Sequence, residues 1–239
     1  ALKGHNVVEA RPGWCGYQGL SLLQLLEQLD VTGAEGHEAF AFPVQWVEKF
    51  SGSSDTSQGR RVFWGRVATG AIKPGQQVKV LPSGQTATIA QVLGHTRQPR
   101  NVPAGHSAGI VLDRQLDISR GDWIASPGSL QPTQRFTATL AWLDTEPATI
   151  GRKYWVRHGN RWVQARITAI EHVLDIHTLA PTDAHQLAVN EIGRVVIQTQ
   201  HALPLQRYAD NRVGGALIVV DPSSNRTSGA LLVEAVNAP

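Results

Sequence analysis

The chain has 239 residues, enough for one large or two ordinary domains, and carries a formal net charge of only +3. Its single cysteine, Cys15, excludes an internal disulfide and therefore a disulfide-stapled secreted scaffold. Basic residues form no run of like charge that would mark a nucleic-acid-binding arm, and no long apolar stretch could span a membrane. We expect a cytoplasmic protein.

The composition and the spacing of turn-forming residues favour strands over helices. The chain holds 23 glycines and 13 prolines, and only 17% of its residues are charged. Short runs rich in Val, Ile, Thr and Trp alternate with these turn-forming residues, which is typical of all-β proteins. The composition therefore predicts an all-β fold of two domains.

One helix is predicted near the start, over residues 21–29. Ser21 and Gln24 have the spacing of a capping box, in which each side chain bonds the other's backbone. Five leucines follow at helical spacing, at positions 22, 23, 25, 26 and 29. A loop then leads into the strands.

Six strands are predicted in the next stretch, and together they favour a closed antiparallel barrel because closure removes exposed strand edges. They lie at 41–48, 61–69, 76–81, 85–93, 107–112 and 122–125. The sequence "ASPGSLQPT" at 125–133 predicts a linker.

A second barrel is predicted after the linker. Its strands lie at 134–143, 153–158, 161–174, 192–200, 216–220 and 229–234, and "HGN" at 158–160 predicts a hairpin turn. The predicted order is one helix, a barrel, a linker and a second barrel.

Two patterns suggest catalysis or metal binding, and both are better explained structurally. "GHSAG" at 105–109 fits the G-x-S-x-G nucleophile elbow, but Ser107 follows a Pro-Gly loop and precedes a predicted strand instead of a helix. His172 and His177 have no accompanying cysteine pair, so we interpret the nine histidines as scattered surface or barrel-end residues.

Cysteine and tryptophan suggest two further sites. Cys15 lies beside Trp14 and Tyr17, and we interpret it as a small buried thiol instead of a nucleophile. Seven tryptophans could stack on nucleobases, but we interpret most of them as core residues of barrel strands: positions 14, 46, 64, 123, 142, 155 and 162.

A nucleotide site is not visible in the sequence itself. No glycine is followed by lysine, so a phosphate-binding P-loop is absent, and no N-K-x-D guanine motif occurs. "DVTG" at 30–33 fits D-x-x-G, but no P-loop precedes it. We therefore expect this chain alone to have no catalytic residue, no metal site and no bound cofactor.

Several longer motifs resemble the translational GTPases, and within them the large GTPase subunit of sulfate adenylyltransferase. "RVFWGRVATGAIKPGQQVKVLPSG" at 61–84 resembles the second domain of the superfamily, and "FPVQ", "VLPSG" and "DISRGD" resemble that subunit. "NEIGRV" at 190–195 and "RYADNRVGGALIVVDPSSNRT" at 207–227 resemble its third domain. The resemblance covers nearly the whole chain and implies two barrels like domains 2 and 3 of elongation factor Tu.

The resemblance also extends to the first residues of the chain. "ALKGHNVV" is similar to the last nucleotide-contacting loop of these GTPases, and "WCGYQGLSLLQLLEQL" to the helix that ends their G domain. The resemblance implies that Ala1 and Leu2 are a remnant of a guanine-contact loop. It also implies a fragment divided into a G-domain remnant at 1–38, a first barrel at 39–130 and a second barrel at 131–239.

The activity implied by the resemblance is sulfate activation in sulfate assimilation. ATP and sulfate form adenosine 5'-phosphosulfate and pyrophosphate, a step driven by GTP hydrolysis, with GTP and Mg bound by the full-length protein. The implied partner is the small catalytic subunit, and some relatives carry a fused adenylylsulfate kinase domain. The alternative is a pair of barrels from a translation-factor GTPase that binds tRNA, which would require a basic stripe across both barrels.

Overall fold

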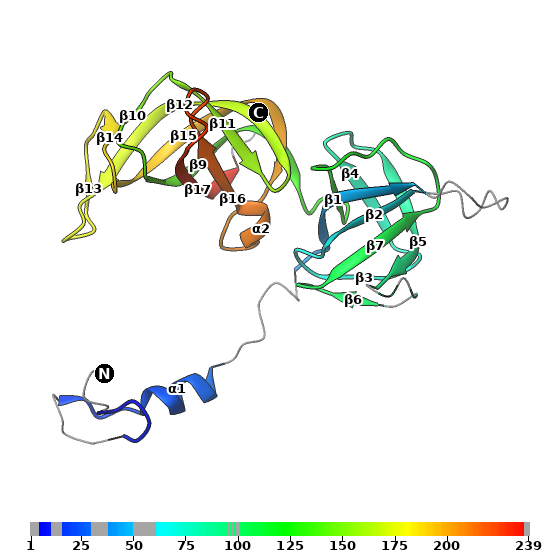
Figure 1. Ribbon diagram of the computed structural model, residues 1–239, viewed down its shortest axis with the longest axis horizontal. Coiled ribbons are helices and arrows are strands. Elements are labelled where there is room, and N and C mark those ends of the chain that lie inside the picture. The colour runs from blue at the N-terminus through cyan, green and yellow to red at the C-terminus, as the bar shows by residue number, and fades with distance from the viewer. Residues whose placement is uncertain are drawn as a thin grey trace. The chain divides into compact units, whose positions relative to one another are not determined.

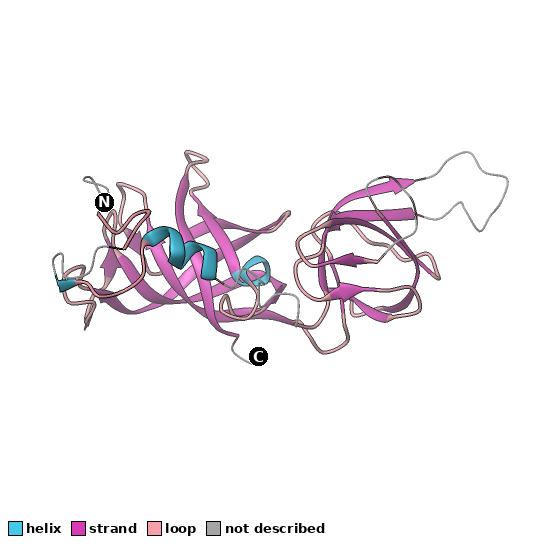
Figure 2. Ribbon diagram, turned by 90° about the horizontal axis from the view of Figure 1, so that it is seen from below, coloured by secondary structure: helices cyan, strands magenta, loops and turns pink. Residues whose placement is uncertain are grey.

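The chain consists of two compact units in a computed structural model that describes residues 5–10, 16–29, 38–49, 61–94, 96, 98 and 101–236. Ala1–Ala34 form the first unit and Glu35–Pro239 the second. The first unit contains one helix, and the second is built from strands (Figures 1 and 2). The prediction of an all-β fold is confirmed.

The helix of the first unit is α1, Leu22–Gln28. Ser21 caps it as the sequence predicts: its hydroxyl accepts from the Gln24 backbone N–H, and the Gln24 side chain accepts from the Ser21 N–H. None of the residues of α1 is buried. Neither α1 nor the four-residue α2 (Arg212–Gly215) is long or apolar enough to cross a bilayer, and the described residues contain no other α-helix.

Six strands close the first barrel, with every neighbouring pair antiparallel. Around the barrel they are β1 (Ala41–Lys49), β2 (Arg61–Arg66), β7 (Ser107–Leu112), β5 (Thr86–Leu93), β4 (Gln77–Leu81) and β8 (Trp123–Ala125). A short ribbon of β3 (Ala71–Ile72) and β6 (Val102–Pro103) accompanies them.

Six longer strands form a second closed circuit, because β11 pairs with β12 as well as with β16. In spatial order they are β11 (Lys153–His158), β16 (Ala216–Val220), β17 (Thr227–Val236), β9 (Gln131–Trp142), β15 (Ile192–Leu205) and β12 (Arg161–Leu174). Strand β13 (Pro181–Thr182) extends β12, β10 (Ala148–Thr149) pairs with β14 (Gln186–Leu187), and α2 covers Arg212–Gly215.

Each barrel encloses its own apolar core. Side chains alternate across a strand, so every second residue of β11 and β12 points inward. Phe42, Phe63 and Ile110 are among the residues that fill the first barrel, and Phe136 and Leu140 among those that fill the second. The two cores are separate, which is why each barrel is a rigid body in its own right.

Each of the twelve predicted strands corresponds to a strand of the structure, and the errors lie in their bounds and in the shortest elements. The predicted bounds of the strands at 153–158, 161–174 and 216–220 are confirmed. The predicted linker at 125–133 is too long, because Gln131 to Thr133 already pair with β15. Five two-residue strands and α2 were not predicted, since so few residues cannot show a period.

We predict that Gly65→Ala lowers the free energy of unfolding by about 2 kcal/mol, the usual cost of overpacking. A methyl group at Gly65 would lie 2.3 Å from the Pro43 carbonyl oxygen and 2.8 Å from the Phe42 ring. Urea denaturation followed by tryptophan fluorescence measures the change. Ser107→Ala, at an exposed strand start in the same barrel, is the control and should stay within about 0.5 kcal/mol; equal stabilities would contradict the prediction.

Candidate functional site at the junction of the two barrels

The two barrels meet at a stack of two buried rings, Trp123 and His158. Their ring centroids are 5.2 Å apart with an angle of 8° between the planes, and neither residue is exposed to solvent. Trp123 comes from β8 of the first barrel and His158 from the end of β11 in the second. Flat stacking of this kind joins the barrels through apolar surface and a fixed ring orientation.

Local sequence explains both positions. Every residue of β8 is buried, because Ile124 faces the core of its own barrel while Trp123 and Ala125 face a second apolar cluster outside it. In β11, Tyr154 and Val156 point inward, and the same alternation carries His158 inward. The strand then turns at Gly159, confirming the predicted hairpin.

His158 is neutral at physiological pH. Its Nε2 donates to the Gly214 carbonyl at 3.1 Å, which leaves Nδ1 buried without a hydrogen-bond partner among the described residues. Burial lowers the pKa of His158 to about 4, and the Gly214 contact opposes this shift only in part. His158 is a barrel-end residue, as the sequence interpretation allows, because it is the last residue of β11. Its complete burial was not predicted.

Polar contacts surround the stack and come from the "DISRGD" motif at 117–122. The Arg161 guanidinium donates to Asp122 Oδ1 at 2.8 Å, and Asp122 Oδ2 accepts from the Ser119 N–H at 2.8 Å. Arg120 donates to Asn160 Oδ1 at 3.3 Å. Gly121 has φ +96°, and a Cβ there would lie 3.1 Å from Arg161, so the turn requires glycine for both reasons.

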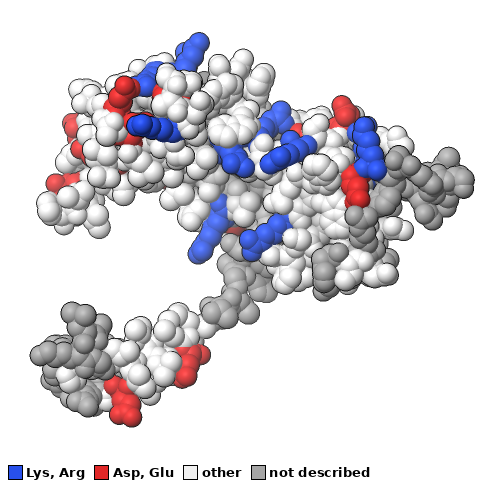
Figure 3. Space-filling model, viewed as in Figure 1, with Lys and Arg blue, Asp and Glu red and all other residues white. Residues whose placement is uncertain are grey.

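Basic side chains gather where the barrels meet (Figure 3). Arg157 belongs to this group: it donates to the Gly159 carbonyl and to Asn160, and its guanidinium lies 5.6 Å from the centroid of the Trp162 ring. Arg157 is thus held by carbonyl, amide and aromatic groups of the junction itself.

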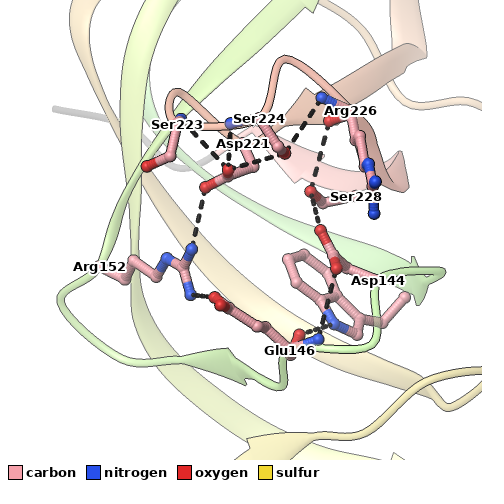
Figure 4. Close-up of polar contacts among 9 residues, drawn as sticks. Asp144, Glu146, Arg152, Asp221, Ser223, Ser224, Arg226 and Ser228 are labelled. Atoms are coloured by element: carbon pink, nitrogen blue, oxygen red, sulfur yellow. Dashed lines mark hydrogen bonds and ion pairs between the residues drawn. The ribbon is translucent and has the colours of Figure 1, made fainter.

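A second polar cluster lies on the second barrel and comes from the "DPSSNRT" part of the last motif (Figure 4). Asp221 accepts from the Ser223 and Ser224 N–H groups, from the Ser224 hydroxyl and from Arg152. Arg152 also pairs with Glu146 at 2.5 Å. One guanidinium therefore ties two loops to the turn after β16.

Hydrogen bonds of the cluster favour the ionised forms of Asp221 and Asp144. The Ser224 N–H lowers the pKa of Asp221, and the Ser228 hydroxyl lowers the pKa of Asp144. The Glu146 contact raises the pKa of Arg152 above its usual range. Carboxylates kept ionised in this way cannot serve as general acids near neutral pH, so the cluster stabilises turns.

The described residues do not offer a cluster of ligands for a metal ion. They contain no group of three His, Cys, Asp or Glu side chains that could hold a metal ion. Asp144, Glu146 and Asp221 are already engaged by Ser228, Arg152 and backbone donors.

The other sequence-predicted positions are not brought together. Ala1, Leu2, Trp14 and Cys15 lie outside the described residues. Ser107 begins β7 and is followed by strand, so the turn interpretation of "GHSAG" is confirmed. His172 lies within β12, and His177 is exposed in the turn beyond it.

The tryptophan interpretation is correct for only two of the six described residues. Trp123 and Trp142 are buried. Trp46 and Trp162 are 63% and 48% exposed, because strand alternation places them on outer barrel faces. Trp64 lies opposite Trp46 in the neighbouring strand and donates from its indole N–H to Glu48.

Comparison with known proteins identifies the relatives of the chain. Sulfate adenylyltransferase subunit 1 of Laribacter hongkongensis is 34% identical over 235 residues, covering 98% of this chain and 48% of the relative. Those of Shewanella oneidensis and Salmonella typhi are 35% and 34% identical, with the same coverage. The chain is similar to sulfate adenylyltransferase subunit 1 over almost its whole length.

The chain spans about half the length of the curated relatives that it matches. Residues 135–234, which lie in the second barrel, match the family described as GTP-eEF1A C-terminal domain-like. The crystal structures of Sup35 with GDP and with GMPPNP share the fold, with TM-scores of 0.76 and 0.77, and are 20% identical. Each covers 99% of this chain and 57% of the solved chain.

We predict that His158 makes the protein less stable in acid. Since its pKa is about 4 when folded and 6.5 when exposed, unfolding takes up a proton in between. The contribution of His158 to the free energy of unfolding should be fully present above the exposed pKa and should be lost as the pH falls toward the folded pKa. Between about pH 7 and pH 5 the free energy of unfolding should drop by about 2 kcal/mol. Urea denaturation followed by Trp123 fluorescence measures it. His158→Phe keeps a stacked ring and should lose that share of the pH dependence; an unchanged dependence would refute the assignment.

The Arg161 and Asp122 pair should couple energetically across the junction. Both side chains are more than two-thirds buried, so a double-mutant cycle with Arg161→Gln and Asp122→Asn should give a coupling of about 1 kcal/mol. Arg61 and Asp117 form the matched control, because their distance is 3.5 Å and Asp117 is 96% exposed. Their coupling should be close to zero. Equal couplings for the two pairs would contradict the prediction that burial strengthens the junction pair.

Proposed function

We propose that this chain supplies the barrel domains of the GTPase subunit of a sulfate adenylyltransferase. The whole protein would serve the reaction of ATP and sulfate to adenosine 5'-phosphosulfate and pyrophosphate, driven by GTP hydrolysis. The observation that carries the proposal is the 34% identity to sulfate adenylyltransferase subunit 1 over 98% of this chain. The tRNA-binding alternative has no comparable support, because the Sup35 likeness at 20% identity concerns the fold alone.

The proposed role of the barrels is mechanical. A closed strand circuit resists deformation, so a displacement imposed on one barrel is passed on as a rotation of a whole body. The Trp123 and His158 stack fixes the orientation of the second barrel on the first, together with the Arg161 and Asp122 pair beside it. The second barrel therefore rotates together with the first. The chemistry of adenylyl transfer belongs, on this proposal, to the small catalytic subunit.

The finer assignments follow from the same proposal. Residues 1–38 are the end of a G domain, 39–130 the first barrel and 131–239 the second, with Ala1 and Leu2 as part of a guanine-contact loop. GTP and Mg²⁺ bind to the G domain of the full-length protein, in the cytoplasm. The relatives' name, subunit 1, supports a partner subunit, and we propose the small catalytic subunit, with a fused adenylylsulfate kinase domain as a further associate.

The test uses the full-length protein mixed with its small partner subunit. Pyrophosphate release from ATP should require sulfate and rise by at least about tenfold with GTP, the size of a modest coupling free energy. The 239-residue chain alone should bind no GTP by calorimetry.

Two outcomes would contradict the proposal. Protection of aminoacyl-tRNA from hydrolysis, without sulfate-dependent pyrophosphate release, would favour the translation-factor alternative. Magnesium-dependent GTP binding by the 239-residue chain alone would refute the placement of the nucleotide site outside the barrels.

A further inference from the structure

A row of basic side chains crosses four neighbouring strands of the second barrel. Lys153 of β11 pairs in register with Arg166 of β12, Arg166 with Gln198 of β15, and Gln198 with Arg135 of β9. Their sequence neighbours, which include Tyr154, Ile167, Ile197 and Phe136, belong to the core. Alternation therefore turns the whole row outward, over about 14 Å at the usual strand spacing.

The positive charges of this row are not neutralised within the described part of the chain, where Lys153, Arg166 and Arg135 make no ion pair. Lys153 and Arg166 lie directly opposite one another, an arrangement that destabilises a sheet.

Other cations of the same barrel do have carboxylate partners. Arg152 pairs with Glu146 and Asp221, and Arg194 with Glu171 and Glu234. The repulsion between cations is therefore left unbalanced at the row, whereas carboxylates balance the positive charge of Arg152 and Arg194.

Arg135 lies beyond Gln198 on the neighbouring strand, while the rest of the row lies in a hollow of about 310 Å³ that is lined with amide groups. Gln164, Gln198 and Gln200 line it beside Lys153 and Arg166. Primary amides donate to carboxylates and carbonyls and also accept from peptide N–H groups. Cations flanked by such amides can bind both the side chains and the backbone of an acidic polypeptide.

We propose that this hollow docks an extended acidic segment of a partner protein, whose carboxylates neutralise Lys153, Arg166 and Arg135. Alternate side chains of an extended segment lie on one face about 7 Å apart, so two or three carboxylates can reach the row. Three cations are few for a nucleic-acid track, which needs many phosphate contacts. The Glu171 and Glu234 carboxylates on the same barrel would also repel a long polyanion.

The test measures binding of a fluorescent decapeptide of alternating Glu and Thr to the 239-residue chain, by anisotropy at low salt. The peptide should bind and be released by added salt, whereas a Gln-Thr decapeptide should not bind. The triple variant Lys153→Gln, Arg166→Gln and Arg135→Gln should bind at least about tenfold more weakly. The control variant Lys49→Gln, Lys73→Gln and Arg212→Gln removes the same charge elsewhere and should stay within about twofold.

Charge reversal gives a second, independent readout. Lys153→Glu with Arg166→Glu should abolish binding of the acidic peptide and create binding of a Lys-Thr decapeptide.

Equal losses in the triple and control variants would overturn the proposal, because binding would then reflect net charge alone. Tighter binding of a single-stranded RNA oligomer, lost in the same triple variant, would overturn it in favour of nucleic acid. Displacement of the peptide by millimolar inorganic sulfate at constant ionic strength would overturn it in favour of a small oxyanion.

Discussion

The stack of Trp123 on His158 is the contact on which the relation of the two barrels depends. Each barrel closes its own strand circuit around its own core, so neither needs the other to bury its interior. What joins them is one buried ring pair with a few polar contacts around it. A joint of this kind defines an orientation through very few side chains, and it can do so only while His158 remains neutral, since a charged imidazole would be costly at a site without solvent.

The motifs that resemble sulfate adenylyltransferase have architectural roles in the described structure. "DISRGD" builds the turn that presents Asp122 to Arg161, and "DPSSNRT" builds the turn in which Asp221 accepts from serine donors and Arg152. Their carboxylates satisfy backbone N–H groups and guanidinium groups. Such residues are needed for the shape of the barrels whatever reaction the whole protein serves, and this agrees with a fold that the chain shares with Sup35 at only 20% identity.

Cations on the outer face of the second barrel fall into two groups, those with carboxylate partners and those without. Around Arg152 and Arg194, positive and negative groups are matched within the barrel. Along Lys153, Arg166 and Arg135 they are not, although all three side chains are exposed and could have been replaced without cost to the core. Surface positions are where barrels of one fold acquire different partners, because packing constrains them least.

Periodic patterns in the sequence determined most of the fold. The strands at 153–158 and 161–174 and the capping box of Ser21 follow from local alternation and spacing, which each segment carries within itself. Alternation from Tyr154 through Val156 already pointed His158 inward, so that signal was available in the sequence. Tertiary structure alone decided that a ring from the other barrel would cover it, that Trp46 would be exposed while Trp142 was buried, and that three distant cations would share one row. The physical reason is that burial and charge pairing depend on which segments meet across the sheets, and that register is set by contacts between residues far apart in the chain.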